Sequence, residues 1–129
     1  RTTAEFWKEK DELNLERALL PSTRMGGHFV QGHIDCVTKI RNIQYFDKSS
    51  TWTFEMADDI EKYIVEKGSI ALNGVSLTVA SKNANTFDVA LIPHTIELTT
   101  FGNLVVGDSV NVEVDILGKY IENFMDIRK

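Results

Sequence analysis

Hydrophobic and polar residues alternate along several short stretches of this chain, which is the pattern of half-buried β-strands. The clearest stretch is SVNVEVDI at residues 109–116, where one face carries only apolar side chains: Val110, Val112, Val114 and Ile116. SIALNGVSLTVA, residues 69–80, has the same alternation on both sides of Asn73-Gly74, a pair that can form a turn or a bulge. Further strand candidates are residues 28–41, 51–56 and 86–92. Many short strands separated by turn signals favour a closed barrel or a sandwich.

Residues 58–68 have helical rather than strand spacing. Asp58 is a candidate N-cap with Glu61 three residues later, and Gly68 is a stop signal. Ile60 and Ile64 fall on one face together with Tyr63. We therefore predict a short helix that caps the barrel.

Residues 118–129 form a second amphipathic segment. Tyr120, Phe124 and Ile127 recur at helical spacing. We expect a C-terminal helix that buries this stripe either on its own barrel or on a neighbouring molecule.

Composition limits the classes of function. With 129 residues, of which 43% are hydrophobic, the chain is long enough for one packed core. A formal net charge of -5 argues against nucleic-acid and anionic-membrane partners, and no apolar run approaches the ~20 residues of a membrane span. Cys36 is the single cysteine, which fits a reducing cytoplasm.

A repeat links the start of the chain to its end. Moved along by 97 positions, TTAEFWKEKDELNLE (residues 2–16) falls without a gap on TTFGNLVVGDSVNVE (residues 99–113). Apolar positions match as well as polar ones, although two β segments that end in acidic residues can also resemble each other by chance. The favoured interpretation is that residues 1–19 end one unit and residues 20–117 form a complete second unit. Because the first residue is Arg1 rather than methionine, we expect the chain to be a piece of something longer.

GGHFVQGHID, residues 26–35, holds His28 and His33, each directly after a glycine. In a regular strand an odd separation sends the two side chains to opposite faces, so one metal ion could bind both only across a bulge. No thiolate pair or HExxH-like helix accompanies them, which disfavours zinc. Residue types alone leave a catalytic site and a glycine-bent strand with two incidental histidines both open.

Four motifs carry a family resemblance: LNLERALLPSTRMGGHFVQGHID, YIVEKGSIALNGVSLTV, IPHTIELTTFG and VNVEVDILGKYIE. In order and spacing they resemble the C-terminal half of riboflavin synthase, over residues 1–122. The resemblance implies an all-β fold: a six-stranded Greek-key closed barrel with a short capping helix and a C-terminal helix. Residues 1–19 would be the tail of a truncated N-terminal lumazine-binding barrel, residues 20–117 the C-terminal barrel and residues 118–129 the helix. The family's NG-x-C-LTV motif of the first barrel is missing.

The reaction that this resemblance implies needs no metal and no redox cofactor. Riboflavin synthase moves a four-carbon unit between two molecules of 6,7-dimethyl-8-ribityllumazine, giving riboflavin and 5-amino-6-(ribitylamino)uracil. Orientation is the largest demand, since fixing two reactants can remove roughly 7–11 kcal/mol of the barrier. In the family the pair of substrates lies between the N-terminal barrel of one subunit and the C-terminal barrel of its neighbour in a homotrimer.

The resemblance also assigns roles, residue by residue. Predicted catalytic residues are His33, Ser76 and Asp115; predicted substrate-binding residues are Lys67, Gly68, Thr78, Ile92, Pro93 and Thr95. His33 would carry a proton, because histidine titrates near neutral pH, whereas His28 is read as structural or supporting. His94 lies beside the substrate-binding segment in the sequence. Without the family, these side chains would read as ordinary strand polar groups, a cation at a helix end and a solvated carboxylate.

A second hypothesis is a non-catalytic relative, such as a fluorescent lumazine-binding accessory protein, which keeps the barrel and the ligand site without turnover. Retention of GGHFVQGH, NGVSLTV, IPHT and Asp115 together favours the enzyme. A generic flavin-binding barrel, as in reductases of related fold, is a distant third.

Overall fold

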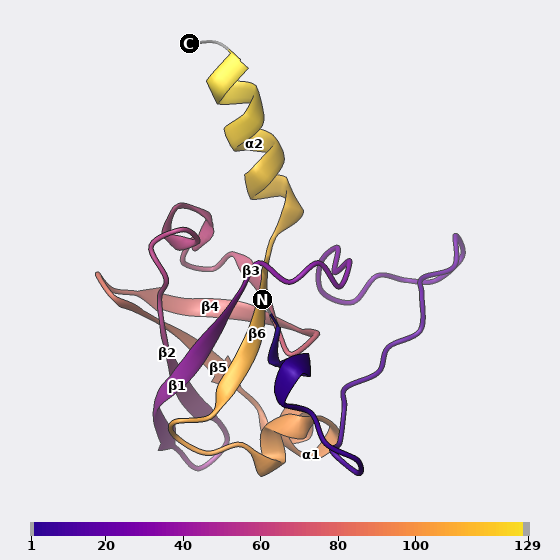
Figure 1. Ribbon diagram of the computed structural model, residues 1–129, viewed down its shortest axis with the longest axis vertical. Coiled ribbons are helices and arrows are strands. Elements are labelled where there is room, and N and C mark those ends of the chain that lie inside the picture. The colour runs from indigo at the N-terminus through magenta and orange to yellow at the C-terminus, as the bar shows by residue number, and fades with distance from the viewer. Residues whose placement is uncertain (1, 128–129) are drawn as a thin grey trace.

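Six antiparallel strands close into a barrel in the computed structural model, which describes residues 2–127 (Figure 1). They are β1 (Cys36–Tyr45), β2 (Ser50–Glu55), β3 (Ser69–Leu72), β4 (Val75–Lys82), β5 (Thr86–Leu91) and β6 (Ser109–Val114). The order around the barrel is β1-β2-β5-β4-β3-β6, and β6 pairs with β1. The β2–β3 and β5–β6 connections therefore join strands that are not neighbours, as in a Greek key. The predicted all-β closed barrel is confirmed.

Alternation along the strands fills the barrel interior. Val110, Val112 and Val114 of β6 are all buried, as the sequence pattern predicts. Two aromatic pairs complete the core: Trp52 and Phe101 meet edge to face at 5.3 Å between ring centroids, and Phe54 and Phe87 stack at 5.5 Å. The interior is packed with side chains, so a ligand must bind on the outside of the wall.

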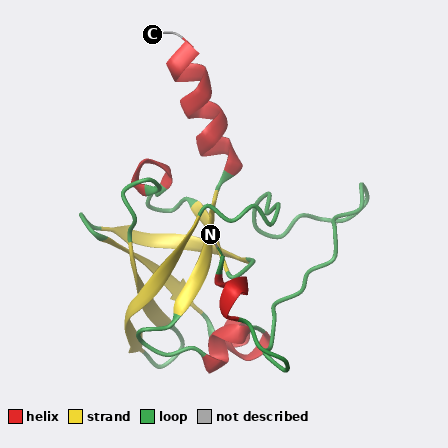
Figure 2. Ribbon diagram, viewed as in Figure 1, coloured by secondary structure: helices red, strands yellow, loops and turns green. Residues whose placement is uncertain are grey.

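The predicted strand over residues 28–41 is wrong in its first part, because β1 begins only at Cys36. Residues 26–35 are irregular and run over the outside of the barrel as part of the long loop in Figure 2. Gly27 and Gly32 have φ values of +101° and +77°, which a regular strand does not contain. The run 109–116 is also shorter as a strand than predicted, since Ile116 already begins the C-terminal helix.

The predicted helix over residues 58–68 is a single 3₁₀ turn, η2 (Glu61–Tyr63). Ile64 has an extended conformation after this turn, and Lys67 a φ of +66°, so the chain leaves the helical path. Ile60 and Ile64 are nevertheless buried, and they close one end of the core as the apolar spacing predicts.

Two helical elements near the end of β5 were not predicted. They are α1 (Pro93–Leu98) and the 3₁₀ turn η3 (Thr100–Asn103). Proline in the first turn of α1 is the available signal, because its fixed φ suits a helix start.

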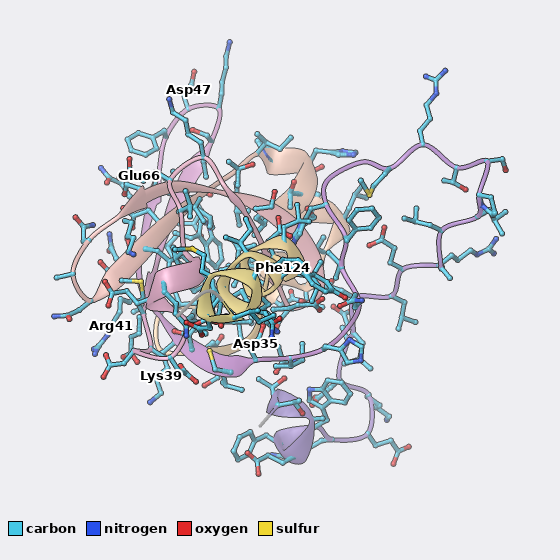
Figure 3. The ribbon with its side chains drawn as sticks, turned by 90° about the horizontal axis from the view of Figure 1, so that it is seen from above. Asp35, Lys39, Arg41, Asp47, Glu66 and Phe124 are labelled. Atoms are coloured by element: carbon cyan, nitrogen blue, oxygen red, sulfur yellow. The ribbon has the colours of Figure 1, made fainter. Side chains whose placement is uncertain are left out.

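The C-terminal helix α2 (Ile116–Ile127) rises from the barrel rather than lying on it (Figure 1). Its first turns are attached by Lys119, whose Nζ lies 2.5 Å from Asp35 Oδ1, and by Glu122, which accepts a hydrogen bond from the Tyr63 hydroxyl. Figure 3, seen along the helix, shows Phe124 above the barrel; its exposed fraction is 64%. The apolar stripe is therefore not buried on its own barrel, and residues 128–129 of the predicted helix lie outside the described residues.

The 97-residue repeat is also a repeat of structure. The 3₁₀ turn η1 (Thr3–Phe6) has the same length as η3 and lies 97 positions before it. Thr2 and Thr99 are the respective N-caps, and the hydroxyl of each accepts a hydrogen bond from the amide two residues later. The two segments therefore share the turn and the cap as well as the sequence pattern.

The turn that follows is repeated as well. The Lys8 amide donates to Asp11 Oδ2, and the Val105 amide donates to Asp108 Oδ2, both at 2.8 Å. Each pair is again separated by 97 positions from its counterpart. Residues 2–11 therefore have the local fold of residues 99–108, although the first copy is not followed by a paired strand.

The two copies contact each other through reciprocal hydrogen bonds. The Thr3 amide donates to Asn111 Oδ1 at 2.7 Å. The Thr100 amide donates to Asn14 Oδ1 at 2.8 Å. Since Thr3 matches Thr100 and Asn14 matches Asn111, the contact has the self-complementary form of a two-fold interface.

Replacing Asn14 tests this contact. Asn14→Ala removes the acceptor of the Thr100 amide and two donor bonds, to Asn73 O and Thr100 Oγ1. We expect amide hydrogen exchange at Thr100 to become about tenfold faster, corresponding to a local loss on the order of 1 kcal/mol. Asn123→Ala, on exposed α2, is the control and should leave the exchange at Thr100 unchanged. Equal exchange rates in the two variants would mean that the contact does not hold residues 2–14 in place.

Candidate functional site

The predicted site residues of β4 lie on the outside of the barrel. Leu77 and Val79 point into the core, so Ser76 and Thr78 point outward, as their spacing predicts. Ser76 is half-buried and Thr78 is exposed. We call the outer surface around these two side chains the β4 face.

Lys67 and Gly68 lie at one end of the β4 face. The Lys67 amide donates to Val79 O at 2.8 Å, and the Val79 amide donates to Gly68 O at 2.9 Å. A Cβ on Gly68 would approach Val65 O to 2.9 Å, so this turn requires glycine. The backbone hydrogen bonds of Lys67 and Gly68 thereby extend the pairing of β3 with β4 next to Thr78.

Ile92, Pro93 and Thr95 follow β5, which is the other neighbour of β4. The antiparallel register, with Val79 opposite Val89, brings the end of β5 beside the start of β4. Ile92 is exposed and is the N-cap of α1, while Thr95 is half-buried inside that helix. The structure thus places seven of the nine predicted residues on β4 or on segments beside its two ends: Lys67, Gly68, Ser76, Thr78, Ile92, Pro93 and Thr95.

It is His28, not His33, that meets this region. His28 Nδ1 lies 2.7 Å from Ser76 Oγ, and either atom can donate, depending on the tautomer. Among the described residues, His28 Nε2 is a buried atom without a hydrogen-bond partner. Gly27 makes the approach possible, since a Cβ there would lie 2.4 Å from the same hydroxyl. The sequence signal for this contact is the glycine that directly precedes His28.

His33 lies over β6 instead. The amide of the preceding Gly32 donates to Glu113 Oε2 at 2.8 Å, and the Asp35 amide donates to Val112 O at 2.8 Å. His33 is exposed between these two attachments. The structure does not bring it to Ser76, and its catalytic role stays a prediction.

Asp115 also lies apart from Ser76. It directly follows β6, which is separated from β4 by β3, and two strand spacings amount to about 10 Å. Asp115 Oδ1 accepts a hydrogen bond from the Leu117 amide at 3.0 Å, so it caps the N-terminus of α2. Its role near the reacting atoms likewise stays a prediction.

On the β4 face, Thr78 is exposed, whereas Ser76 lies under Gly27 and His28. A hollow of about 210 Å³ borders it at Pro93 and is lined mainly by residues of the β1–β2 hairpin and α1. A larger hollow of about 780 Å³ lies between η1 and the barrel. Neither of these two hollows is lined by Ser76 or Thr78. In residues 2–127 no group of three His, Cys, Asp or Glu side chains could hold a metal ion, and no helix is long and apolar enough to cross a membrane.

The fold and the polar side chains on the outer wall define the class of this protein. It is a small β-barrel with a candidate ligand-binding surface. The family model described as "Lumazine binding domain" matches residues 31–115, which is more than half of the chain. The chain belongs to this lumazine-binding domain family.

Curated relatives of the chain are named riboflavin synthase. The protein of Photobacterium phosphoreum is 40% identical over 129 residues, covering all of this chain and 59% of the relative. The protein of Schizosaccharomyces pombe is 47% identical over 120 residues, covering 92% of this chain and 58% of the relative. The chain therefore spans somewhat more than half the length of these relatives.

Solved structures of LumP share the fold. The complex with 6,7-dimethyl-8-(1'-D-ribityl) lumazine has a TM-score of 0.75 and 23% identity, covering 88% of this chain and 60% of LumP. The complex with riboflavin has a TM-score of 0.67 and 22% identity, covering 72% of this chain and 50% of LumP. At this level of identity the likeness concerns the arrangement of the strands.

Cys36 gives a test of the packing at the start of β1. Burial, followed by the negative charges of Asp59 and Asp35, raises the pKa of the Cys36 thiol from 9.0 to about 11. Between these two pH values the thiol is protonated in the folded state and ionised in the unfolded state, so a rise in pH favours unfolding. We expect the free energy of unfolding to fall more steeply over this range in the unchanged protein than in Cys36→Ser. Chemical denaturation at pH 8, 9, 10 and 11 measures the difference, and parallel curves would contradict it.

Proposed function

We propose that the chain is part of a riboflavin synthase, a transferase that converts two molecules of 6,7-dimethyl-8-ribityllumazine into riboflavin and 5-amino-6-(ribitylamino)uracil. The observation that carries the proposal is the position of Lys67, Gly68, Ser76, Thr78 and Thr95 on β4 or beside its two ends. The names of relatives with 40–47% identity support it.

In this proposal the β4 face binds one flat heterocycle. The hydroxyls of Ser76 and Thr78 are hydrogen-bonding groups for polar atoms of the ring, and Lys67 lies beside them for the hydroxyls of the ribityl chain. Ile92 offers an exposed apolar side chain next to β5. His28 fixes the direction of the Ser76 hydroxyl through its 2.7 Å contact.

The second substrate needs a second wall. The exposure of Thr78 on the β4 face favours a composite site, in which the N-terminal barrel of a neighbouring subunit covers the bound heterocycle. The main catalytic contribution is then the stacking of two reactants in a fixed orientation, while a base removes a proton from an acidic ring methyl. His33 and Asp115 are proposed to act in these proton transfers, and no metal or cofactor takes part.

A homotrimer is part of the proposal. The exposed apolar residues of α2 support it, because a stripe that its own barrel does not bury fits burial between subunits: Leu117, Tyr120, Ile121, Phe124 and Ile127. We also propose a cytoplasmic location, which the unpaired Cys36 thiol supports.

A non-catalytic lumazine- or flavin-binding protein is the second candidate. The fold that the chain shares with lumazine- and riboflavin-bound LumP supports this candidate. Riboflavin formation by the protein with both barrels separates the two candidates, since a binding protein would retain the ligand unchanged.

For the 129-residue chain we expect binding without turnover, because only one wall of each composite site is present. Fluorescence titration with riboflavin should show weak saturable binding, and incubation with the lumazine should form no riboflavin. Formation of riboflavin at the rate of a two-barrel protein would contradict the composite site.

Replacing the polar side chains tests their proposed roles in the protein that carries both barrels. Ser76→Ala and His33→Ala should lower turnover more than thermal stability, and loss of a proton carrier typically costs ~10²–10⁴ in rate. Ser22→Ala, in an exposed loop, is the control and should change stability by less than about 0.5 kcal/mol. Steady-state kinetics and melting curves on the same samples give both quantities. Unchanged turnover in His33→Ala would mean that His33 has no catalytic role and is an incidental residue of a glycine-bent segment.

A further inference from the structure

Glu113 is a buried carboxylate on the outward side of the barrel wall. Its neighbours Val112 and Val114 point into the core, so alternation along β6 sends Glu113 outward, where a carboxylate is normally solvated. Its exposed fraction is nevertheless only 4%. Gln31 and Gly32 lie against it, which makes Glu113 part of the contact between the segment 26–33 and the wall.

Backbone amides of the segment 26–33 bind both carboxylate oxygens. The Gln31 amide donates to Oε1 at 2.6 Å, and the Gly32 amide donates to Oε2 at 2.8 Å. The φ of +77° at Gly32 suits the approach of consecutive amides to one anion. Because both donors belong to the backbone, the position of the carboxylate fixes the path of the segment.

The same segment is attached at a second point, on Ser76. Strand register places Ser76 opposite Ala71 and Ala71 opposite Glu113, so these three residues form one row across β4, β3 and β6. Two strand spacings are about 9.5 Å, and three extended residues, the distance from His28 to Gln31, span about 10 Å. Residues 28–31 must therefore be nearly fully extended to cross the row. A change in the position of Gln31 and Gly32 at Glu113 would then move His28 relative to Ser76.

The repeat supplies a matched position. Glu16 is the counterpart of Glu113 at the offset of 97 residues. Glu16 is exposed, and within residues 2–127 its side chain makes no hydrogen bond or ion pair. Glu16 is therefore the same residue type at the same repeat position as Glu113, but no other described segment of the chain binds its carboxylate.

We propose that Glu113 is a positioning residue of the β4 face: by holding the amides of Gln31 and Gly32 it sets His28 on Ser76, and thereby directs the Ser76 hydroxyl toward the ligand. The proposal rests on the proposed function only for the last step. The placement of His28 can be tested without any ligand.

The test uses Glu113→Gln in the 129-residue chain. The variant keeps the side-chain volume but turns an NH₂ group toward one of the two backbone donors, so one of the two bonds is lost. Two-dimensional ¹H–¹⁵N NMR then reports the Gln31 and Gly32 amides and the ring nitrogens of His28. We expect both amides to shift upfield and the His28 ring signals to move to their positions in Ser76→Ala. Glu16→Gln is the control and should leave these signals unchanged.

Riboflavin titration of the same variants tests the last step. Glu113→Gln and Ser76→Ala should each lower the affinity for riboflavin by about tenfold. The affinity of the double variant should be no lower than that of the single variant with the lower affinity. Independent effects would multiply to about a hundredfold and would overturn the positioning role.

The remaining outcomes are also decisive. Unchanged His28 ring signals in Glu113→Gln would overturn the proposal even if the melting temperature fell. If Glu113→Gln does not fold, Glu113→Asp retains the charge and withdraws it by one methylene, and the same His28 shift is expected in smaller degree. Absence of riboflavin binding in the unchanged chain would contradict the proposed function, while the NMR result would still decide the placement of His28.

Discussion

Closure of the barrel between β1 and β6 is the constraint on which the rest of the structure depends. The register from Cys36 opposite Val112 to Lys39 opposite Ser109 joins strands that lie about 70 residues apart and leaves no free sheet edge. Once the sheet is closed, every strand has an inside and an outside. The inside is filled mainly by apolar side chains, together with the hydrogen-bonded Thr38 and Ser50, so the candidate binding residues lie on the outer wall.

The outer wall is used in different ways around the barrel. On β3, β4 and β6 the segment 26–33 lies across the strands and brings His28 to Ser76. At one end of the barrel, residues 2–14 bind through Thr3 and Asn14 to their own repeat counterparts. Beside these contacts, Thr78 of the β4 face is exposed. An exposed polar side chain on a rigid wall suits a site whose other half comes from another barrel.

The sequence repeat gives residues 2–11 and residues 99–108 the same local structure. The same caps, 3₁₀ turn and aspartate-bound turn form at both copies, because all of these interactions are local in sequence. The strand that follows differs, since β6 pairs with β1 and β3, whereas Leu13 and Leu15 of the first copy are exposed. Local interactions repeat with the sequence, but strand pairing requires partners.

Alternation by itself determined the inward residues of β4 and β6 and the outward direction of Ser76 and Thr78, because side-chain direction in a strand follows from its two-residue period. It could not determine the path of residues 26–35 or the length of the helix at 58–68, since both depend on contacts with distant strands. Only the tertiary structure decided that His28 rather than His33 meets Ser76. That choice follows from Glu113, 85 residues beyond His28, whose carboxylate holds the segment in place.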